Sequence, residues 1–195
     1  DHHLPGNELP KAFAILDAKQ NDCNYPYKEL SGCGVGFKLA QAILETQEKP
    51  LKNLFQFLDY CAISIAADIV DMNGENRILS YHGLKLLNTN TRAGLKQVLK
   101  RGEQNISEII NSDIVFKIAP RINAAGRIND AKDAVKLLIV NETNKANELA
   151  FQIEEYNKLR KELEKEATTQ ALALIKEKQL ENTASTVIYS DEWHK

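Results

Sequence analysis

The spacing of apolar residues divides the chain into helical and extended stretches. From residue 51 onward, apolar side chains recur at steps of three and four, which predicts one long, well-buried helix ending near Val70. From Thr143 to about Asn182, a narrow apolar stripe in a charged background predicts a long connector helix, with coiled-coil pairing as the alternative. Shorter helices are predicted at about residues 37–46, 78–87, 93–100, 106–111 and 130–139.

Three short apolar runs predict extended backbone instead. Residues 12–16, bounded by Pro10 and polar residues, are interpreted as a buried strand of a parallel sheet. Residues 114–120 are expected to be extended, because a proline biases the residue before it away from the helical region. Residues 185–189 predict the first strand of a following domain.

The predicted fold class is therefore α/β. Residues 1–140 are expected to form the helix-rich C-terminal part of a parallel-sheet domain. Residues 141–183 would be the connector helix, and residues 184–195 would begin a second domain.

Composition excludes several classes of protein. With 43% hydrophobic and 27% charged residues, the chain has the balance of a globular protein in water. A net charge of -2 predicts no general attraction to nucleic acid, so any contact with a polyanion must be local. No apolar run approaches the ~20 residues of a membrane span. The three cysteines form no C-x-x-C pair, which predicts reduced thiols and a cytoplasmic location.

Asp1, His2 and His3 form a cluster of residue types that bind divalent cations. Each imidazole can donate a nitrogen, and the carboxylate can bind the metal or orient a ring. Adjacent histidines are also common as tag remnants, so this triplet alone leaves both interpretations open. Asp68 projects beside the apolar face of the predicted helix, where a carboxylate needs a cation, an ion pair or several donors. The alternative for Asp68 is a bond to Arg77 or to a backbone N–H.

Residues 121–127 place two arginines around three small side chains. Small residues let a ligand approach the backbone, and the guanidinium fork of Arg matches two phosphate oxygens. In the alternative interpretation, the small residues pack against a neighbouring element and the arginines pair with acids. The glycines of residues 32–36 match neither nucleotide-binding consensus, which favours a packing role.

Together these stretches resemble one protein family. Asp1-His2-His3 with Pro5 resembles the motif that names the DHH phosphoesterase superfamily. Residues 66–70 and 74–77 resemble the later aspartate motif of its RecJ branch, and residues 120–127 resemble a stretch particular to that branch. Residues 31–39 and 190–194 add support, and the resemblance covers essentially the whole chain.

The resemblance implies a two-metal phosphodiesterase using Mn²⁺ or Mg²⁺, which degrades single-stranded DNA from the 5′ end in repair and recombination. It implies metal binding by His2, Asp68 and Asp1, catalytic roles for His3 and Asp1, and contacts to the nucleic-acid backbone by Arg121, Asn123 and Arg127. Single-stranded DNA would be the partner, with no membrane, and the resemblance names no protein partner.

One departure from the family pattern affects the expected activity. The Asp-rich motifs that supply most remaining metal ligands precede the DHH triplet in the family, and this sequence does not contain them. We therefore expect the polypeptide as given to bind metal poorly and DNA weakly, and not to be a competent nuclease alone. The alternatives are another DHH phosphodiesterase, such as an oligoribonuclease or a cyclic-dinucleotide hydrolase, and a non-catalytic DNA-binding scaffold.

Overall fold

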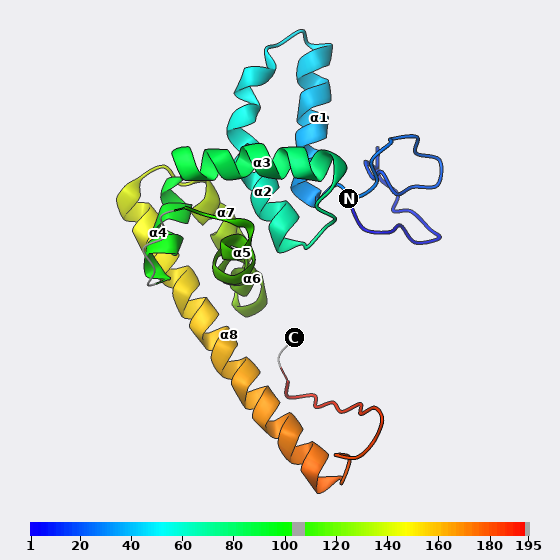
Figure 1. The fold of residues 1–195 in the computed structure, drawn as a ribbon, viewed down its shortest axis with the longest axis vertical. Coiled ribbons are helices and arrows are strands. Elements are labelled where there is room, and N and C mark those ends of the chain that lie inside the picture. The colour runs from blue at the N-terminus through cyan, green and yellow to red at the C-terminus, as the bar shows by residue number, and fades with distance from the viewer. Residues whose placement is uncertain (103–107, 194–195) are drawn as a thin grey trace. The chain divides into compact units, whose positions relative to one another are not determined.

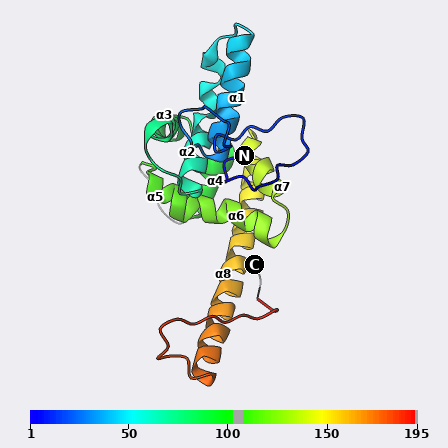
Figure 2. The same ribbon diagram turned by 90° about the vertical axis from the view of Figure 1, so that its right-hand side faces the viewer.

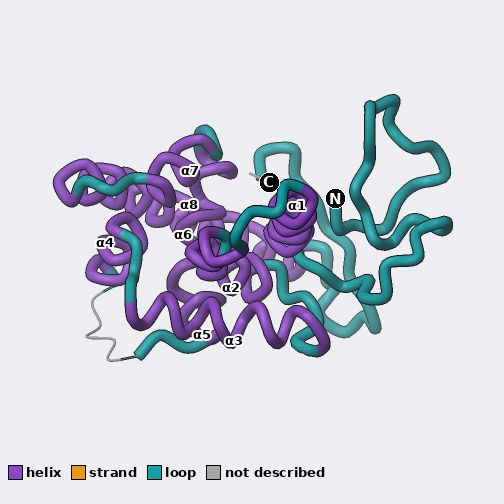
Figure 3. The backbone as a smooth tube through the Cα atoms, turned by 90° about the horizontal axis from the view of Figure 1, so that it is seen from above, coloured by secondary structure: helices purple, strands orange, loops and turns teal. Residues whose placement is uncertain are grey.

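The computed structural model describes residues 1–102 and 108–193. Within this part of the chain, the regular elements are all helical, as the tube view in Figure 3 shows. Three short turns of 3-10 or π type accompany the α-helices: η1 Leu51–Asn53, η2 Phe55–Phe57 and η3 Ile114–Ile118. The α-helices are α1 Gly32–Thr46, α2 Leu58–Ala67, α3 Gly74–Thr89, α4 Ala93–Arg101, α5 Asn111–Asp113, α6 Ala119–Ile128, α7 Lys132–Ile139 and α8 Thr143–Glu177.

The predicted α/β fold is not confirmed, because neither predicted strand is present in the described residues. Residues 12–16 and 185–189 are irregular. A strand exists only where its backbone exchanges hydrogen bonds with a neighbouring strand. Neither segment has such a neighbour here, and their apolar side chains Phe13, Val187 and Tyr189 are almost fully exposed.

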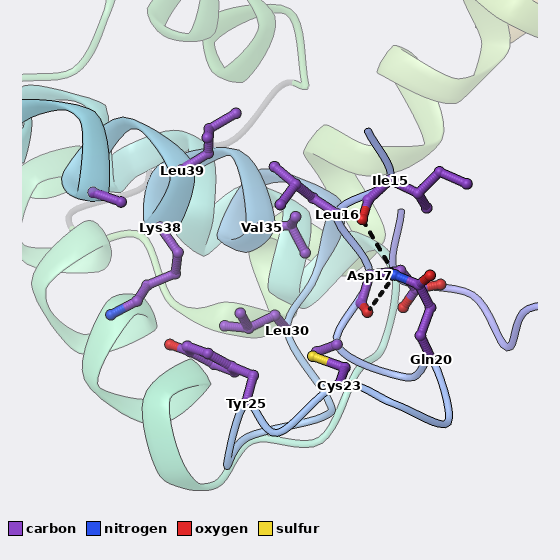
Figure 4. Close-up of a pocket in the computed structure, with 12 residues that line it drawn as sticks. Ile15, Leu16, Asp17, Gln20, Cys23, Tyr25, Leu30, Val35, Lys38 and Leu39 are labelled. Carbon is purple, nitrogen blue, oxygen red and sulfur yellow. Dashed lines mark hydrogen bonds between the residues drawn. The ribbon is translucent and has the colours of Figure 1, made fainter. Parts of the chain in front are cut away.

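The loop around residues 12–20 borders a mainly apolar groove beside α1, shown in Figure 4. The side-chain amide of Gln20 donates to the carbonyl oxygens of Ile15 and Asp17, each at 3.2 Å. Leu30 and Val35 line the same groove. The backbone of the predicted strand is therefore held partly by a side chain rather than by a sheet.

The prediction of extended backbone at residues 114–120 is wrong. This segment forms the π turn η3 and the start of α6. The N–H of Ala119 donates to the carbonyl of Ile114, five residues back. Proline cannot donate a backbone hydrogen bond and crowds the preceding turn. A widened turn directly before Pro120 lets the helix continue through it, and such π turns are a recognised feature of distorted helices.

Helix α1 begins earlier than predicted, and the helix predicted from residue 51 begins as tighter turns. Ser31 caps α1, its Oγ accepting the Gly34 N–H at 3.3 Å. Residues 51–57 form η1 and η2, and the regular helix α2 ends at Ala67. The other helices lie close to their predicted positions, except the one expected at 106–111. Residues 106 and 107 lie outside the described part of the chain, residues 108–110 are not helical, and α5 begins only at Asn111.

One compact unit contains Asp1–Arg92 and a later segment ending at Ala119. In it, α2 packs against both α1 and α3, and Figure 1 shows α3 crossing α2. The core side chains are Leu30, Phe37, Leu54, Cys61, Ile65 and Leu79. The buried carboxylate of Asp59 accepts two bonds from Arg92, at 2.5 and 3.1 Å, which fixes the end of α3 to the start of α2.

The second unit contains α4, most of α6, α7 and α8. Its core side chains are Val98, Ala125, Ala134, Leu137, Leu149, Ala150 and Ile153. Figure 2 shows α8 as one unbroken helix, which at 35 residues would be about 52 Å long. The long helix is thus confirmed, although the domain boundaries at residues 140 and 183 stay predictions. Within the described residues, no helix is long and apolar enough to span a membrane.

A buried carboxylate joins α7 to α8 and should make the fold sensitive to acid. Asp133 accepts bonds from Lys136 at 2.9 Å and from Tyr156 and Asn129 at 3.2 Å each. The bond from Lys136 outweighs the opposing effect of desolvation, and the pKa of Asp133 falls below its ordinary value. A carboxyl with a lowered pKa in the folded state stabilises the fold above its unfolded-state pKa and loses that contribution as the pH falls through the folded-state value.

We therefore expect Asp133→Asn to reduce the acid sensitivity of folding. Urea unfolding followed by circular dichroism at pH 7 and pH 3 should give a smaller difference in unfolding free energy than in the wild type. Asp22→Asn, in an exposed loop, is the control and should keep the wild-type difference. An unchanged difference in Asp133→Asn would show that this carboxylate does not contribute to acid unfolding.

Candidate functional site

The carboxylate of Asp1 organises the DHH triplet. Its Oδ1 accepts the backbone N–H groups of His2 at 2.6 Å and His3 at 3.2 Å, and it lies 2.7 Å from Nδ1 of His3. The backbone nitrogen of Asp1 donates to the carbonyl of Leu16 at 2.5 Å. This carboxylate therefore orients the exposed ring of His3 while the backbone holds the triplet against the neighbouring loop.

His2 and Asp68 lie next to each other although 65 residues separate them in the sequence. His2 Nε2 is 3.8 Å from Asp68 Oδ2. The ring of His2 is mostly buried, with 19% of the side chain exposed, and it lies over Gly32 at the start of α1. The folding of one compact unit thus brings a ring nitrogen and a carboxylate oxygen, both metal-ligand types, to one place.

The end of helix α2 positions Asp68. Its backbone N–H donates to the carbonyl of Ser64 at 2.9 Å, and the next residue, Ile69, has a φ of 53° that ends the helix. Ser64 Oγ donates to Asp68 Oδ2 at 3.3 Å and accepts the backbone N–H of Cys33 at 3.4 Å. Ser64 therefore fixes the carboxylate from one helical turn away.

Ser64 is not among the site residues predicted from the sequence, although its spacing of four residues from Asp68 could have identified it. Among the residues that the structure describes, the Asp68 carboxylate bonds neither to Arg77 nor to a backbone N–H, the two alternatives considered for it.

Two cysteines belong to the surroundings of Ser64 and Asp68, where Cys61 is buried and Cys33 is exposed. Burial raises the pKa of Cys61 to about 12, and its Sγ donates to the carbonyl of Cys33 at 3.8 Å. Burial also raises the pKa of Cys33, which the bond with Ser64 partly opposes and the charge of Asp68 reinforces. Without a bound cation, the raised pKa values favour the thiol form of both cysteines.

Residues 74–77 stabilise the start of α3. Glu75 accepts bonds from the Tyr25 hydroxyl at 2.6 Å and from Lys38 at 3.1 Å. Asn76 is fully buried and donates to the carbonyls of Glu29 and Asp71. This part of the aspartate motif connects α3 to the N-terminal loops and holds the chain that follows Asp68.

The predicted phosphate-binding residues lie on α6, and their surroundings differ. Arg121 forms an ion pair with Glu154 at 2.5 Å, and both side chains are largely buried. Ala124 and Ala125 are fully buried, as packing residues would be, whereas Asn123 and Arg127 are exposed. For Arg121 and the two alanines the alternative interpretation therefore holds: the arginine pairs with an acid, and the small residues pack in the core. The phosphate contacts of Arg121, Asn123 and Arg127 stay predictions.

The described residues contain no group of three or more His, Cys, Asp or Glu side chains that could hold a metal ion. His2 and Asp68 are thus a pair of suitable ligands, and Asp1 contacts His3 rather than joining that pair. The roles predicted for Asp1, His2, His3 and Asp68 stay predictions, now with a defined geometry.

Comparison with known proteins finds several relatives that carry the same description. The chain is 41% identical over 187 residues to the single-stranded-DNA-specific exonuclease RecJ of Bacillus subtilis, covering 96% of this chain and 23% of that protein. It is 34% identical over 209 residues to the Escherichia coli RecJ, covering 100% of this chain and 36% of that protein. The chain therefore spans about a quarter to a third of the length of these relatives. No family model matches it.

Solved structures of RecJ also match the fold of this chain. The crystal structure of RecJ from Thermus thermophilus in complex with Mn²⁺ matches with a TM-score of 0.75 and 28% identity, over 89% of this chain and 26% of that chain. A structure of exonuclease RecJ bound to manganese matches with a TM-score of 0.76 and 29% identity, over 89% of this chain and 43% of that chain. In sequence and in fold, the chain is thus similar over nearly its whole length to part of these RecJ exonucleases.

Proposed function

We propose that this chain forms part of the catalytic region of a metal-dependent exonuclease that hydrolyses phosphodiester bonds of single-stranded DNA in the 5′→3′ direction, in repair and recombination. The observation that carries the proposal is the 3.8 Å approach of His2 Nε2 to Asp68 Oδ2. The similar RecJ proteins are named as single-stranded-DNA-specific exonucleases. The matching crystal structures of RecJ from Thermus thermophilus contain Mn²⁺ or Mg²⁺, which supports these cations as cofactors.

The side chains present are suited to part of such a metal site. His2 and Asp68 would hold a divalent cation, because an imidazole nitrogen and a carboxylate oxygen both bind Mn²⁺ well. When bound, the cations stabilise negative charge on the phosphate and activate the attacking water. Ser64 restrains the Asp68 carboxylate, and the mostly buried ring of His2 has little freedom to rotate away.

His3 and Asp1 would act on the substrate side of the site. The His3 ring is exposed and held by the Asp1 carboxylate at 2.7 Å. That bond favours a proton on Nδ1 and leaves Nε2 free of Asp1. Nε2 could then contact the scissile phosphate or move a proton during hydrolysis. In this proposal Asp1 acts catalytically by orienting His3, with direct metal binding as its alternative role.

The DNA backbone would contact α6. Arg127 and Asn123 are exposed there, and both side chains can donate hydrogen bonds to phosphate oxygens. Arg121 is paired with Glu154, so a phosphate contact by Arg121 would require exchange of that partner.

The finer parts of the predicted architecture also belong to this proposal. The exposed side chains of Phe13 and Val187 suit segments that become strands when a partner strand is available. Residues 12–16 would then join a parallel sheet, and residues 185–189 would begin the following domain. The proposed location is the cytoplasm.

A chimeric exonuclease tests the proposed function. This chain would replace the matching segment of the Bacillus subtilis RecJ, with which it shares 41% identity over 187 residues. With Mn²⁺ and a single-stranded oligonucleotide labelled at the 3′ end, we expect mononucleotide release and shortening from the 5′ end. A folded chimera that binds DNA without cleaving it would instead favour the scaffold alternative. Preferential cleavage of short RNA or cyclic dinucleotides would favour another DHH phosphodiesterase.

A further inference from the structure

A polar cavity lies between α6 and α8 in the second compact unit. Its volume is about 260 Å³, and its lining includes Arg127 from α6 with Arg160, Leu163, Glu164 and Thr168 from α8. Two arginines and one glutamate give these side chains a net charge of about +1 at neutral pH. The cavity is thus suited to an anion, although one carboxylate already occupies part of it.

Arg160 has incomplete hydrogen bonding in this cavity. Its Nη1 donates to Glu164 Oε2 at 2.8 Å, and its Nη2 lies at the 3.5 Å limit from Asn157 Oδ1. Its Nε is buried and has no partner. Buried N–H groups in native proteins are nearly always paired, so an unpaired one calls for an additional acceptor. A phosphate oxygen is a strong acceptor of this kind. The Arg160 side chain is 25% exposed, so a phosphate can reach its guanidinium, whereas the buried Nε becomes accessible only when the side chain turns.

The ion pair with Glu164 is weak enough to be exchanged. Glu164 is 65% exposed and lies one helical turn from Arg160 on the same face of α8. Exposed pairs with this spacing contribute little to stability, because water screens both charges. Arg127, across the cavity, is exposed and has no ion-pair partner among the described residues. A phosphate group entering the cavity could therefore engage Arg127 and replace Glu164 as the partner of Arg160.

We propose that Arg160 is a further phosphate-binding residue that acts with Arg127 on the backbone of single-stranded DNA, and that Glu164 is the internal counterion that this phosphate displaces. The proposal deepens the function proposed above, because it assigns the substrate contact made by α8. The phosphate could be internal or could be the 5′-terminal group, since both present the same oxygens.

Fluorescence anisotropy with the full chain tests this assignment. The probe is a labelled oligothymidylate of about 15 nucleotides, titrated at several salt concentrations in EDTA, so that neither cleavage nor the metal site affects the result. Arg160→Gln should weaken binding at least fivefold and reduce the slope of log affinity against log salt by about 0.7, the value for one single-strand phosphate contact. Glu164→Gln should strengthen binding severalfold, because the competing carboxylate is gone.

Lys161→Gln is the matched control, since it removes the same charge from the next, exposed position of α8. It should change the affinity by less than about twofold, because a screened charge outside the cavity contributes little. Equal losses in Arg160→Gln and Lys161→Gln, weaker binding by Glu164→Gln, or no measurable DNA binding by the wild type would each overturn the proposal. Because Glu164→Gln has an expected gain, a folding defect in Arg160→Gln cannot hide the answer.

Probes with a 5′-phosphate and a 5′-hydroxyl distinguish the two sources of phosphate. A larger loss on the 5′-phosphorylated probe supports the proposal with the terminal group as ligand, and equal losses support it with an internal phosphate. The experiment is also separate from the cleavage test. An inactive chimera would leave the affinity changes at Arg160 and Glu164 intact, whereas unchanged affinities would leave cleavage by the chimera intact.

Discussion

Replacing His2 by Ala in the chimeric exonuclease should lower the rate of single-strand degradation about a thousandfold. In the proposed function His2 is a metal ligand, and metal binding supplies several kcal/mol of stabilisation to the transition state. A loss of about 4 kcal/mol corresponds to a factor on the order of 10³ in rate. The measurement is initial-rate release of mononucleotides at saturating DNA and a fixed Mn²⁺ concentration.

Two further measurements separate a lost metal ligand from a damaged fold. Raising the Mn²⁺ concentration should restore part of the activity of the His2→Ala chimera, since weakened binding can be offset by mass action. His82→Ala provides the control, because His82 is an exposed histidine on α3 of the same compact unit. That variant should keep wild-type activity. A His2→Ala chimera within threefold of the wild-type rate would mean that His2 does not bind the catalytic metal.

Local sequence patterns predicted most of the helices. They could not show whether an apolar run has the partner segment that a strand requires. The stripe of Leu149 and Ile153 identified α8, because a helix forms its hydrogen bonds within its own segment. The apolar run at residues 12–16 gave an equally local signal, yet a strand depends on a second segment. The backbone before Pro120 differs from the prediction for another reason: the π turn there absorbs the distortion that usually ends a helix.

The candidate site shows the same division between local and non-local information. Asp1, His2 and Asp68 could be identified from residue type and from the family resemblance. The approach of His2 to Asp68 depends on how α1 and α2 pack, which no single segment encodes. The pairing of Arg121 with Glu154 was equally hidden, because α6 and α8 are distant in sequence. The signal for Arg160 was weaker still, since a charged residue on a charged helix is unremarkable until its unpaired Nε is seen.

Packing between α2 and α3 should be the most sensitive point of the first compact unit. Gly83 of α3 lies directly against α2, where these two helices make the most extensive contact. A Cβ added at Gly83 would lie 2.6 Å from the Cβ of Ala62 and closer still to the carbonyl oxygen of Leu58. The atoms in the way belong to backbone or to a short side chain, so they cannot rotate aside. Gly83→Ala therefore forces the helices apart.

We expect Gly83→Ala to destabilise this unit by about 3 kcal/mol, at the upper end of overpacking effects. Urea unfolding followed by circular dichroism measures the change. Gly36→Ala is the matched control: Gly36 is also a helical glycine, in α1, but no atom lies within 4 Å of a Cβ added there. Because alanine favours helix over glycine, that variant should gain about 0.5–1 kcal/mol. The opposite signs separate close packing from helix propensity. Similar gains in both variants would mean that α2 and α3 do not approach as closely at Gly83 as described.

Since α2 carries Ser64 and Asp68 at its end, the loosened Gly83→Ala variant should also bind Mn²⁺ less tightly than Gly36→Ala.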